Sequence, residues 1–456
     1  MLDNFQHYAD EMLEKHRLPA LSMAVWKDGT LHKAASGILN IDTGVEATTD
    51  SIFQIGSITK VFTASLMMKL VEEGRVDLDK PVIHYLRSFQ VADRKATETI
   101  TVGQLLNHTN GIAGDYFVDD QNEDGPHIAR FIDRCSQLPL VHPVGDGFSY
   151  SNVGFAVAGR LIEVVTGMSW FDAMEALIYQ PLGMKQAICR PADVIRFRAA
   201  LGHLPQKNQA EPWRTCSGNY LCLGLSSAGT TPTMTASDLI LFGRAHMEKG
   251  LNGKCERWLS EESVRAMQTP SVEMPTPSDI IRSSMGRGWG LSQHLASGEC
   301  YASHTGGTNG QCALLRIFPE QQACFVLQMN EQNLSALMDI GNELTEKIAG
   351  LSLTPSAEKP EINLSLKALE KLVGHFRSYG GDYTVTLGAD GISATFVDSV
   401  NEEDTLKLKL KPLGEECFDQ QNEQGISEGI VRFMNPDAQG RPSRLFVSAR
   451  IFQRVA

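Results

Sequence analysis

Residues 53–74, FQIGSITKVFTASLMMKLVEEG, decide the fold that we expect for this chain. Apolar residues recur at helical spacing over 59–73 and stop at Gly74, which predicts a buried helix with a glycine cap. Ser57 and Lys60 stand three residues apart at its start, so their side chains can touch. A lysine in a desolvated pocket has a lowered pKa and can take the proton of a serine hydroxyl, while the helix N-terminus directs N–H groups at the reacting oxygen.

Taken alone, S-x-x-K is a weak signal, because a capping serine beside a solvated lysine fits it equally well. A second segment, Tyr150-Ser151-Asn152, precedes another apolar helical stretch. A loop there would present a phenol that relays protons and a carboxamide that holds a substrate carbonyl. The structural alternative is a core tyrosine followed by Ser151 or Asn152 as a helix cap.

A third segment, His304-Thr305-Gly306-Gly307, precedes the apolar stretch CALLRIF, which is predicted to be a strand. Its two glycines allow the backbone of a substrate to approach a sheet edge closely. By itself the segment would be interpreted as a turn. The order of the three segments along the chain is what favours a shared catalytic site.

That order, S-x-x-K, Y-x-N and H-T-G, resembles the serine β-lactamase and penicillin-binding-protein family, particularly its class C β-lactamase, esterase and D-aminopeptidase branches. The resemblance covers roughly residues 8 to 350. It includes LLNHTNGI at 105–112, QPLGM at 180–184, SSAGTTPTMTASDLILFGR at 226–244 and GRGWGL at 286–291. The later segment GHFRSYGGDYTVTL resembles the opening of the lipocalin-like domain attached to some D-amino-acid peptidases and penicillin-binding-protein-like thioesterases.

The resemblance implies a role for each site residue. Ser57 would be the nucleophile, and Lys60 and Tyr150 would transfer protons. Asn152 would contact Lys60 and the substrate. The backbone N–H groups of Ser57 and Gly307 would form an oxyanion hole for the negative charge of the tetrahedral intermediate.

His304 departs from the β-lactamase pattern, in which a lysine usually stands at this position and helps to bind a carboxylate. His304 and Thr305 are expected to bind substrate, and His304 resembles the esterase, D-aminopeptidase and peptide-cyclising branches. A histidine is only partly charged near neutral pH. We therefore expect β-lactamase activity to be weak or incidental.

The expected fold class is α+β, with a β-lactamase-like catalytic domain over 1–352 and a small antiparallel β-barrel, lipocalin-like, over 360–456. The first domain would have an antiparallel sheet flanked by helices, plus an all-helical region over about 80 to 280. Asp28-Gly29 predicts a hairpin turn, and residues 101–104 and 235–238 look like capping boxes. The strand hairpin of 312–330 and the helix after it would close the domain.

The polar segment LSLTPSAEKPEIN places a linker near 352 to 363. Beyond it, strands alternate apolar and polar residues, as where Leu406, Leu408 and Leu410 alternate with lysines. The barrel is expected to be a packed appendage or a ligand holder, and we assign no site residue to it.

The net charge of −13 would repel nucleic acid and anionic lipid, so the expected partner is a small-molecule ester or peptide substrate, with no nucleic acid and no membrane. The start of the chain lacks the pattern of a secretory signal, which predicts a cytoplasmic location. The nine cysteines have irregular spacings and are expected to be reduced and mostly buried. No metal or other cofactor is expected, because HExxH, P-loop and strand-linked GxGxxG motifs are absent.

The sequence thus predicts a serine hydrolase that forms an acyl-enzyme at Ser57 with esters or D-amino-acid-containing amides, of the esterase or D-aminopeptidase type. Acyl transfer, as in a penicillin-binding-protein-type thioesterase or peptide cyclase, is an alternative that shares the acyl-enzyme. An alternative of another class is a non-catalytic ligand-sensing or assembly protein on the same fold. The oligomeric state is left open.

Overall fold

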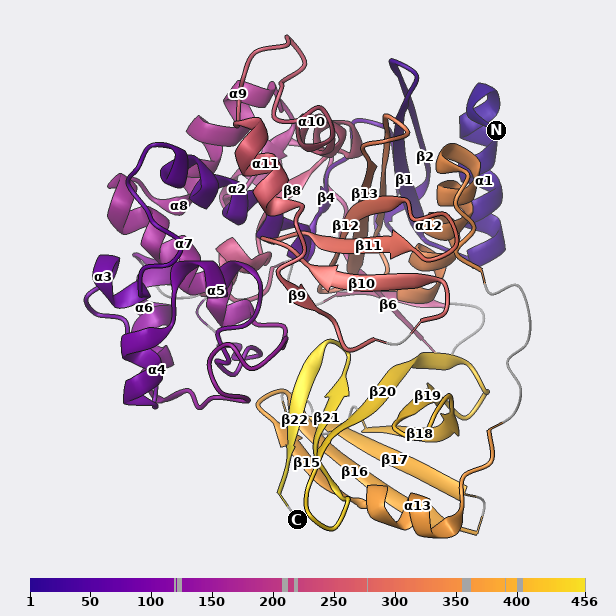
Figure 1. Ribbon diagram of the computed structural model, residues 1–456. Coiled ribbons are helices and arrows are strands. Elements are labelled where there is room, and N and C mark those ends of the chain that lie inside the picture. Colours follow the sequence, from indigo (N-terminus) through magenta and orange to yellow (C-terminus); the bar gives the residue numbers. More distant parts are fainter. Residues whose placement is uncertain are drawn as a thin grey trace.

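The α/β part of the chain is built around a nine-stranded sheet with the order β3-β2-β1-β14-β13-β12-β11-β10-β9 (Figure 1). The computed structural model describes residues 1–118, 120, 125–206, 212–216, 220–276, 278–354, 362–389, 391–399 and 405–455. The strands of the sheet are β1 (Ala20–Lys27), β2 (Thr30–Asn40), β3 (Val45–Glu46), β9 (Val272–Glu273), β10 (Ile281–Met285), β11 (Gly290–His294), β12 (Cys300–Thr308), β13 (Gln311–Phe318) and β14 (Ala323–Met329). Because β1 pairs with β14, segments from both ends of this part meet in one antiparallel sheet, as predicted.

The predicted hairpins are confirmed. Asp28 and Gly29 form the two-residue turn between β1 and β2, with φ angles of 50° and 77°. Such positive φ values match the twist of a tight hairpin. The strand hairpin expected over 312–330 is formed by β13 and β14, and it turns at residues 319–322.

Helices cover both faces of the sheet. The helices α1 (Phe5–His16) and α12 (Leu334–Ala349) pack together with one set of inward-facing strand residues, such as Met23 and Leu327. The opposite face, which includes Ala24 and Val326, packs against α2 (Thr59–Glu72), α7 (Asn152–Thr166) and α10 (Ala236–Met247). Alternate strand residues therefore feed two separate cores, as the period of two in a strand requires.

The middle of the chain is mainly helical, as expected, and contains short strands as well. Its other helices are α3 (Val82–Tyr85), α4 (Arg94–Thr99), α5 (Val102–Leu106), α6 (His127–Arg134), α8 (Trp170–Met174), α9 (Gln180–Leu182) and α11 (Glu261–Met267). The short strands β4 (Phe53–Gln54), β8 (Thr233–Met234) and β5 (Ala187–Ile188) form one small sheet, and β6 (His203–Pro205) pairs with β7 (Trp213–Thr215). No helix of the described residues is long and apolar enough to cross a bilayer.

One of the two predicted capping boxes is complete. At α5 the Thr101 side chain and the Gln104 side chain each accept a backbone N–H of the other residue. At α10 the Thr235 side chain accepts the N–H of Asp238. The Asp238 carboxylate accepts the N–H of Gln186 at 2.6 Å instead of closing the box. The Asp238 carboxylate is therefore bonded to a distant residue and not to the backbone of Thr235.

The C-terminal part is a closed eight-stranded antiparallel barrel, which confirms the predicted fold class. After α13 (Leu366–Leu372) its strands are β15 (Gly374–Ser378), β16 (Gly381–Gly388), β17 (Gly391–Asp398), β18 (Thr405–Pro412), β19 (Cys417–Gln421), β20 (Ser427–Pro436), β21 (Pro442–Val447) and β22 (Arg450–Arg454). Leu408 and Leu410 point inward, whereas Leu406 is half-exposed. Most of the predicted linker, residues 355–361, lies outside the described residues.

The barrel contacts the α/β part through the β21–β22 hairpin, which rises from the barrel towards it (Figure 1). The backbone N–H of Tyr150 donates to the carbonyl of Ala449 in the hairpin turn, at 2.8 Å. Nearby, Phe446 and Ile451 share a small apolar core with Phe148. Backbone pairing and apolar packing together fix the hairpin beside the segment that carries Tyr150.

The nine cysteines all lie among the described residues and none is in a disulfide there; seven of them are buried, as the sequence predicted. The two that are exposed are Cys255 and Cys300.

The aromatic contact between α2 and α10 supports the helix that begins beside Ser57. Phe62 and Phe242 are fully buried and stack with ring centroids 3.6 Å apart. Replacing Phe242 by alanine should leave a cavity and lower the free energy of unfolding by about 3–5 kcal/mol, measured by urea denaturation. Phe242→Leu should cost distinctly less, because it retains most of the volume. Equal losses for the two variants would contradict this packing role.

Candidate active site

Ser57 lies where a 3₁₀ turn, Gly56–Ile58, runs into α2. Gly56 has a φ of 52°, and a Cβ at this position would stand 2.5 Å from the backbone nitrogen of Gly307. Only glycine permits both this conformation and the close approach of β12. The start of α2 is therefore held against β12, with Ser57 at the junction.

Lys60 is completely buried beneath Ser57. Its Nζ lies 3.0 Å from Ser57 Oγ and donates to the carbonyl of Ala228 at 2.6 Å. Burial holds the pKa of Lys60 well below its ordinary value, and the charge of Arg450 lowers it further, while Asp115 acts in the opposite direction. The buried amine is thus biased toward the neutral form, which can accept a proton.

Tyr150 lies directly beside this pair. Lys60 Nζ is 4.7 Å from the centroid of the Tyr150 ring. Burial raises the pKa of the phenol, and a hydrogen bond with Ser57 partly opposes that effect. The phenol is therefore held in its protonated form near neutral pH, within reach of the serine hydroxyl.

Asn152 begins α7, and Ser151 caps the helix by accepting the N–H of Gly154 at 3.0 Å. The structural interpretation is confirmed for Ser151, whereas the catalytic and substrate-binding roles of Tyr150 and Asn152 stay predictions. The contact expected between Asn152 and Lys60 is not among the hydrogen bonds of the described residues. Asn152 Nδ2 donates instead to Asp115 Oδ1 at 3.1 Å.

The segment from His304 to Gly307 is part of strand β12 rather than a turn before the strand. Its residues pair with β13, and the turn follows at residues 309–310. A Cβ on Gly306 would stand 1.9 Å from the carbonyl oxygen of Ile55. The glycines therefore let the strand edge press against the loop before Ser57, and Thr305 lies on the same stretch.

His304 is buried, and its Nδ1 lies 2.6 Å from the carbonyl oxygen of Thr305. Burial, assisted by the charge of Lys60, lowers the pKa of His304 to about 4. The ring is therefore neutral at pH 7 and does not supply the positive charge of the lysine it replaces. This strengthens the sequence-based argument against a β-lactam carboxylate clamp at this position.

Sequence reasoning missed three residues that surround the Ser57, Lys60 and Tyr150 cluster. The first is His108, whose ring stacks on Tyr150 with centroids 4.4 Å apart. Its Nδ1 accepts the N–H of Ser151 at 2.9 Å, so the proton of the neutral ring is on Nε2. Burial lowers the pKa of His108 well below its ordinary value, which keeps the ring neutral. The motif LLNHTNGI contains it, but offers no sign of this stacking.

The other two missed residues are Asp115 and Arg450, which form an ion pair between the α/β part and the barrel. Arg450 Nη2 donates to Asp115 Oδ1 at 2.9 Å, and its Nε contacts the second carboxylate oxygen. The guanidinium lies 5.0 Å from the centroid of the Tyr150 ring. The barrel thus supplies a positive charge beside the site, while His304 on β12 stays neutral.

Comparison with known proteins agrees with this arrangement. The beta-lactamase family model matches residues 5–349. The chain belongs to the beta-lactamase family. Penicillin-binding protein 4 of Amycolatopsis lactamdurans is 34% identical over 383 residues, covering 83% of this chain and 98% of that protein. Esterase EstB of Burkholderia gladioli is 29% identical over 223 residues, which cover 46% of this chain and 56% of that protein.

Among solved structures, that of SurE is 26% identical with a TM-score of 0.77, and covers 99% of both chains. A D-amino acid amidase from Ochrobactrum anthropi shares the fold over 77% of this chain, with a TM-score of 0.61 and 22% identity. This beta-lactamase-family protein is a hydrolase of the serine β-lactamase and penicillin-binding-protein group. Its likeness to SurE extends over the barrel as well.

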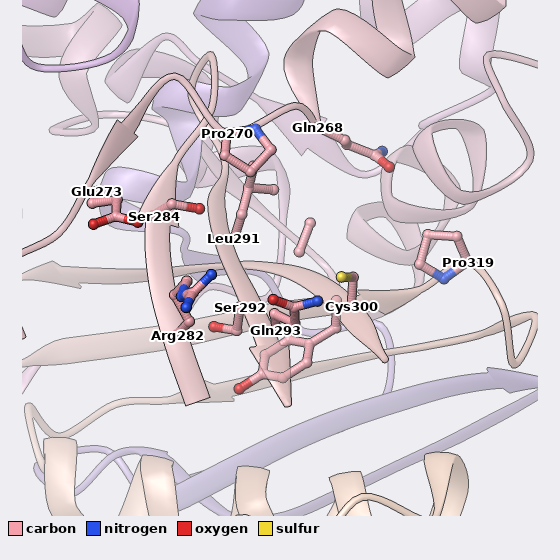
Figure 2. A pocket seen from close by; sticks show the side chains of 12 residues that line it. Gln268, Pro270, Glu273, Arg282, Ser284, Leu291, Ser292, Gln293, Cys300 and Pro319 are labelled. Carbon is pink, nitrogen blue, oxygen red and sulfur yellow. The ribbon is translucent and has the colours of Figure 1, made fainter. Parts of the chain in front are cut away.

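A separate hollow of about 310 Å³ lies over strands β9 to β12 (Figure 2). Glu273, Arg282 and Gln293 are among the side chains that line it. Neither Ser57 nor Lys60 borders this hollow. The site is therefore identified by the chemistry around Ser57 rather than by the shape of this surface.

The ion pair predicts opposite pH shifts for two neutralising substitutions. Arg450→Gln removes the charge that lowers the pKa of Lys60 and leaves Asp115 unpaired, so that pKa should rise. Asp115→Asn removes the charge that raises it, so that pKa should fall. The acidic limb of the rate of Ser57 labelling by a fluorophosphonate should move to higher pH in Arg450→Gln and to lower pH in Asp115→Asn.

The matched control is Arg444→Gln in the same hairpin. Arg444 Nη1 lies 3.0 Å from Asp146 Oδ2, and Arg444 is not among the charges that shift the pKa of Lys60. Its profile should coincide with that of the unmodified protein. Shifts in the same direction for Arg450→Gln and Asp115→Asn would refute the electrostatic coupling.

Proposed function

We propose that Ser57 attacks the carbonyl of esters or D-amino-acid-containing amides and carries the acyl group as a covalent intermediate. The observation that carries this proposal is the 3.0 Å approach of Lys60 Nζ to Ser57 Oγ inside a pocket that lowers the pKa of the amine. A serine hydroxyl becomes an effective nucleophile when an adjacent base takes its proton.

In the acylation step, Ser57 Oγ bonds to the carbonyl carbon while its proton moves to Lys60. The backbone N–H groups of Ser57 and Gly307 receive the negative charge on the carbonyl oxygen. Removing one such donor typically raises the barrier by about 2.7–4 kcal/mol. As the intermediate collapses, the leaving group takes a proton that Lys60 passes on through Tyr150, and water then releases the acyl group by the reverse sequence.

The relatives support the substrate classes that we propose. EstB is named as an esterase, and the protein from Ochrobactrum anthropi is named as a D-amino acid amidase. Asn152, held by Asp115, and the strand edge at His304 and Thr305 are the groups that we assign to substrate binding. The cytoplasmic location and the domain boundaries stay predictions.

Substitution at the three central residues tests the mechanism. Ser57→Ala should abolish turnover of p-nitrophenyl acetate, and Lys60→Ala or Tyr150→Phe should slow acylation by about 10²–10⁴-fold. Intact-mass spectrometry after fluorophosphonate treatment should show one adduct, on Ser57. Normal turnover by Ser57→Ala would exclude the mechanism, and the absence of any adduct would favour the non-catalytic alternative.

The stereochemistry of the substrate is tested with paired D- and L-aminoacyl p-nitroanilides. Cleavage of the D-series alone would establish the amide specificity that we propose. Turnover restricted to esters would establish an esterase.

Acyl transfer is a second candidate, and the position of Arg450 favours it. Arginine binds carboxylates through two parallel hydrogen bonds. Arg450 already uses Nε and Nη2 for Asp115 and Nη1 for the carbonyl of Ser448, so it would bind the carboxylate of an incoming amine by exchanging Asp115 for it. A second solved structure of SurE, 26% identical to this chain, includes D-Leu. Such an acceptor would replace water in the second step.

If Arg450 positions an acceptor, turnover of p-nitrophenyl acetate with added D-leucine should yield N-acetyl-D-leucine, detected by mass spectrometry. Arg450→Gln should lower the ratio of transfer to hydrolysis by about tenfold, and the Arg444→Gln control should retain it. D-leucine amide, which lacks the carboxylate, should give little transfer with either protein. If only hydrolysis is observed with both acceptors and all proteins, the hydrolase function stands and acyl transfer is excluded.

A further inference from the structure

The barrel is filled at one end and hollow at the other. Phe376, Phe418 and Phe433 are buried at the filled end, where Phe433 packs edge-on against both other rings. None of these three borders the hollow, which has a volume of about 410 Å³. That volume falls within the roughly 300–1,000 Å³ of small-molecule sites.

The hollow extends to the Asp115–Arg450 pair, which lies beside the candidate active site. Asp115 and Arg450 both line it, and the same two residues contact Asn152 and Tyr150. The turn between β15 and β16 also lies against the α/β part, since a Cβ on Gly380 would stand 3.4 Å from Asp115 Oδ2. The Asp115–Arg450 pair therefore forms a wall that the hollow and the active site share.

The hollow has apolar walls with a polar rim that includes Asp398 and Glu428. The apolar walls include Phe396, Leu406, Leu408, Val447 and Phe452. Phe452 and Leu408 are buried, whereas Leu406 stands half-exposed at the rim. An empty space with such walls favours a ligand that removes apolar surface from water.

One buried amide adds a directional feature. Gln420 is 2% exposed, and its Oε1 accepts the hydroxyl of Tyr383 at 2.7 Å. Gln420 and Tyr383 both line the hollow. The other polar atom of this amide, Nε2, is a donor that can bind a carbonyl oxygen of a ligand.

We propose that this hollow is an acyl-group subsite, which binds the distal apolar part of the acyl group carried by Ser57. The inference rests on the proposed function. The acyl group stays attached to Ser57 through both steps, whereas the leaving group departs, so binding energy on the acyl group serves the whole cycle. A long-chain or apolar peptidyl acyl group, with one carbonyl oriented by Gln420, fits this lining.

The first experiment compares kcat/KM for p-nitrophenyl octanoate and p-nitrophenyl acetate. Leu408→Trp should fill the hollow and lower the octanoate-to-acetate ratio by about tenfold, because several methylenes lose their site. Leu406→Trp at the half-exposed rim should lower the ratio as well, and it should destabilise the fold less because Leu406 is not buried. The matched control is Leu366→Trp on α13, which is 70% exposed and lies outside the hollow.

The second experiment needs no turnover. In a Ser57→Ala background, the neutral apolar dye N-phenyl-1-naphthylamine should bind with enhanced fluorescence. Adding Leu408→Trp should weaken that binding by about tenfold, and adding Leu366→Trp should leave it unchanged.

Equal chain-length ratios and equal dye binding in the Leu408→Trp, Leu406→Trp and Leu366→Trp proteins would overturn the subsite. Failure of the proposed function is a distinct result, since the dye would still bind in the hollow while no ester is turned over. Loss of octanoate preference together with loss of dye binding, in Leu408→Trp or Leu406→Trp alone, would support the subsite.

Discussion

The burial of one amine beside one hydroxyl is the constraint on which the rest of the site depends. Lys60 lies under Ser57 in a space closed by α2, α7 and β12, and its Nζ is held by the carbonyl of Ala228. Water cannot solvate the ammonium there, so the charged form is disfavoured. The tight glycine contacts at Gly56 and Gly306 serve this closure, because a side chain at either position would push β12 away from Ser57.

The barrel is part of this electrostatic arrangement rather than a remote appendage. The β21–β22 hairpin places Arg450 beside Tyr150, and Asp115 both pairs with that guanidinium and holds Asn152. His304 on β12 is neutral near pH 7, whereas Arg450 on the barrel hairpin carries a positive charge and lies beside Tyr150. The junction between the two parts therefore places a charged pair next to Tyr150 and Asn152.

Local sequence patterns predicted much of the fold, since they act over a few residues. The Asp28-Gly29 turn, the helix that ends before Gly74 and the Thr101 capping box all formed as expected. The box at Thr235 did not close, because Asp238 accepts the distant N–H of Gln186. Asn152 Nδ2 donates to Asp115, a residue 37 positions away in the chain that no local pattern links to it.

The sequence by itself determined the family, the two-part architecture and the cluster of Ser57, Lys60 and Tyr150, because motif order and periodicity are properties of the linear chain. Only the tertiary structure decided what surrounds that cluster. Arg450 is separated from Asp115 by more than three hundred residues, and nothing local to either marks the pair. The low pKa of His304 and the hollow in the barrel also follow from tertiary structure alone, because burial and cavities depend on how distant segments pack.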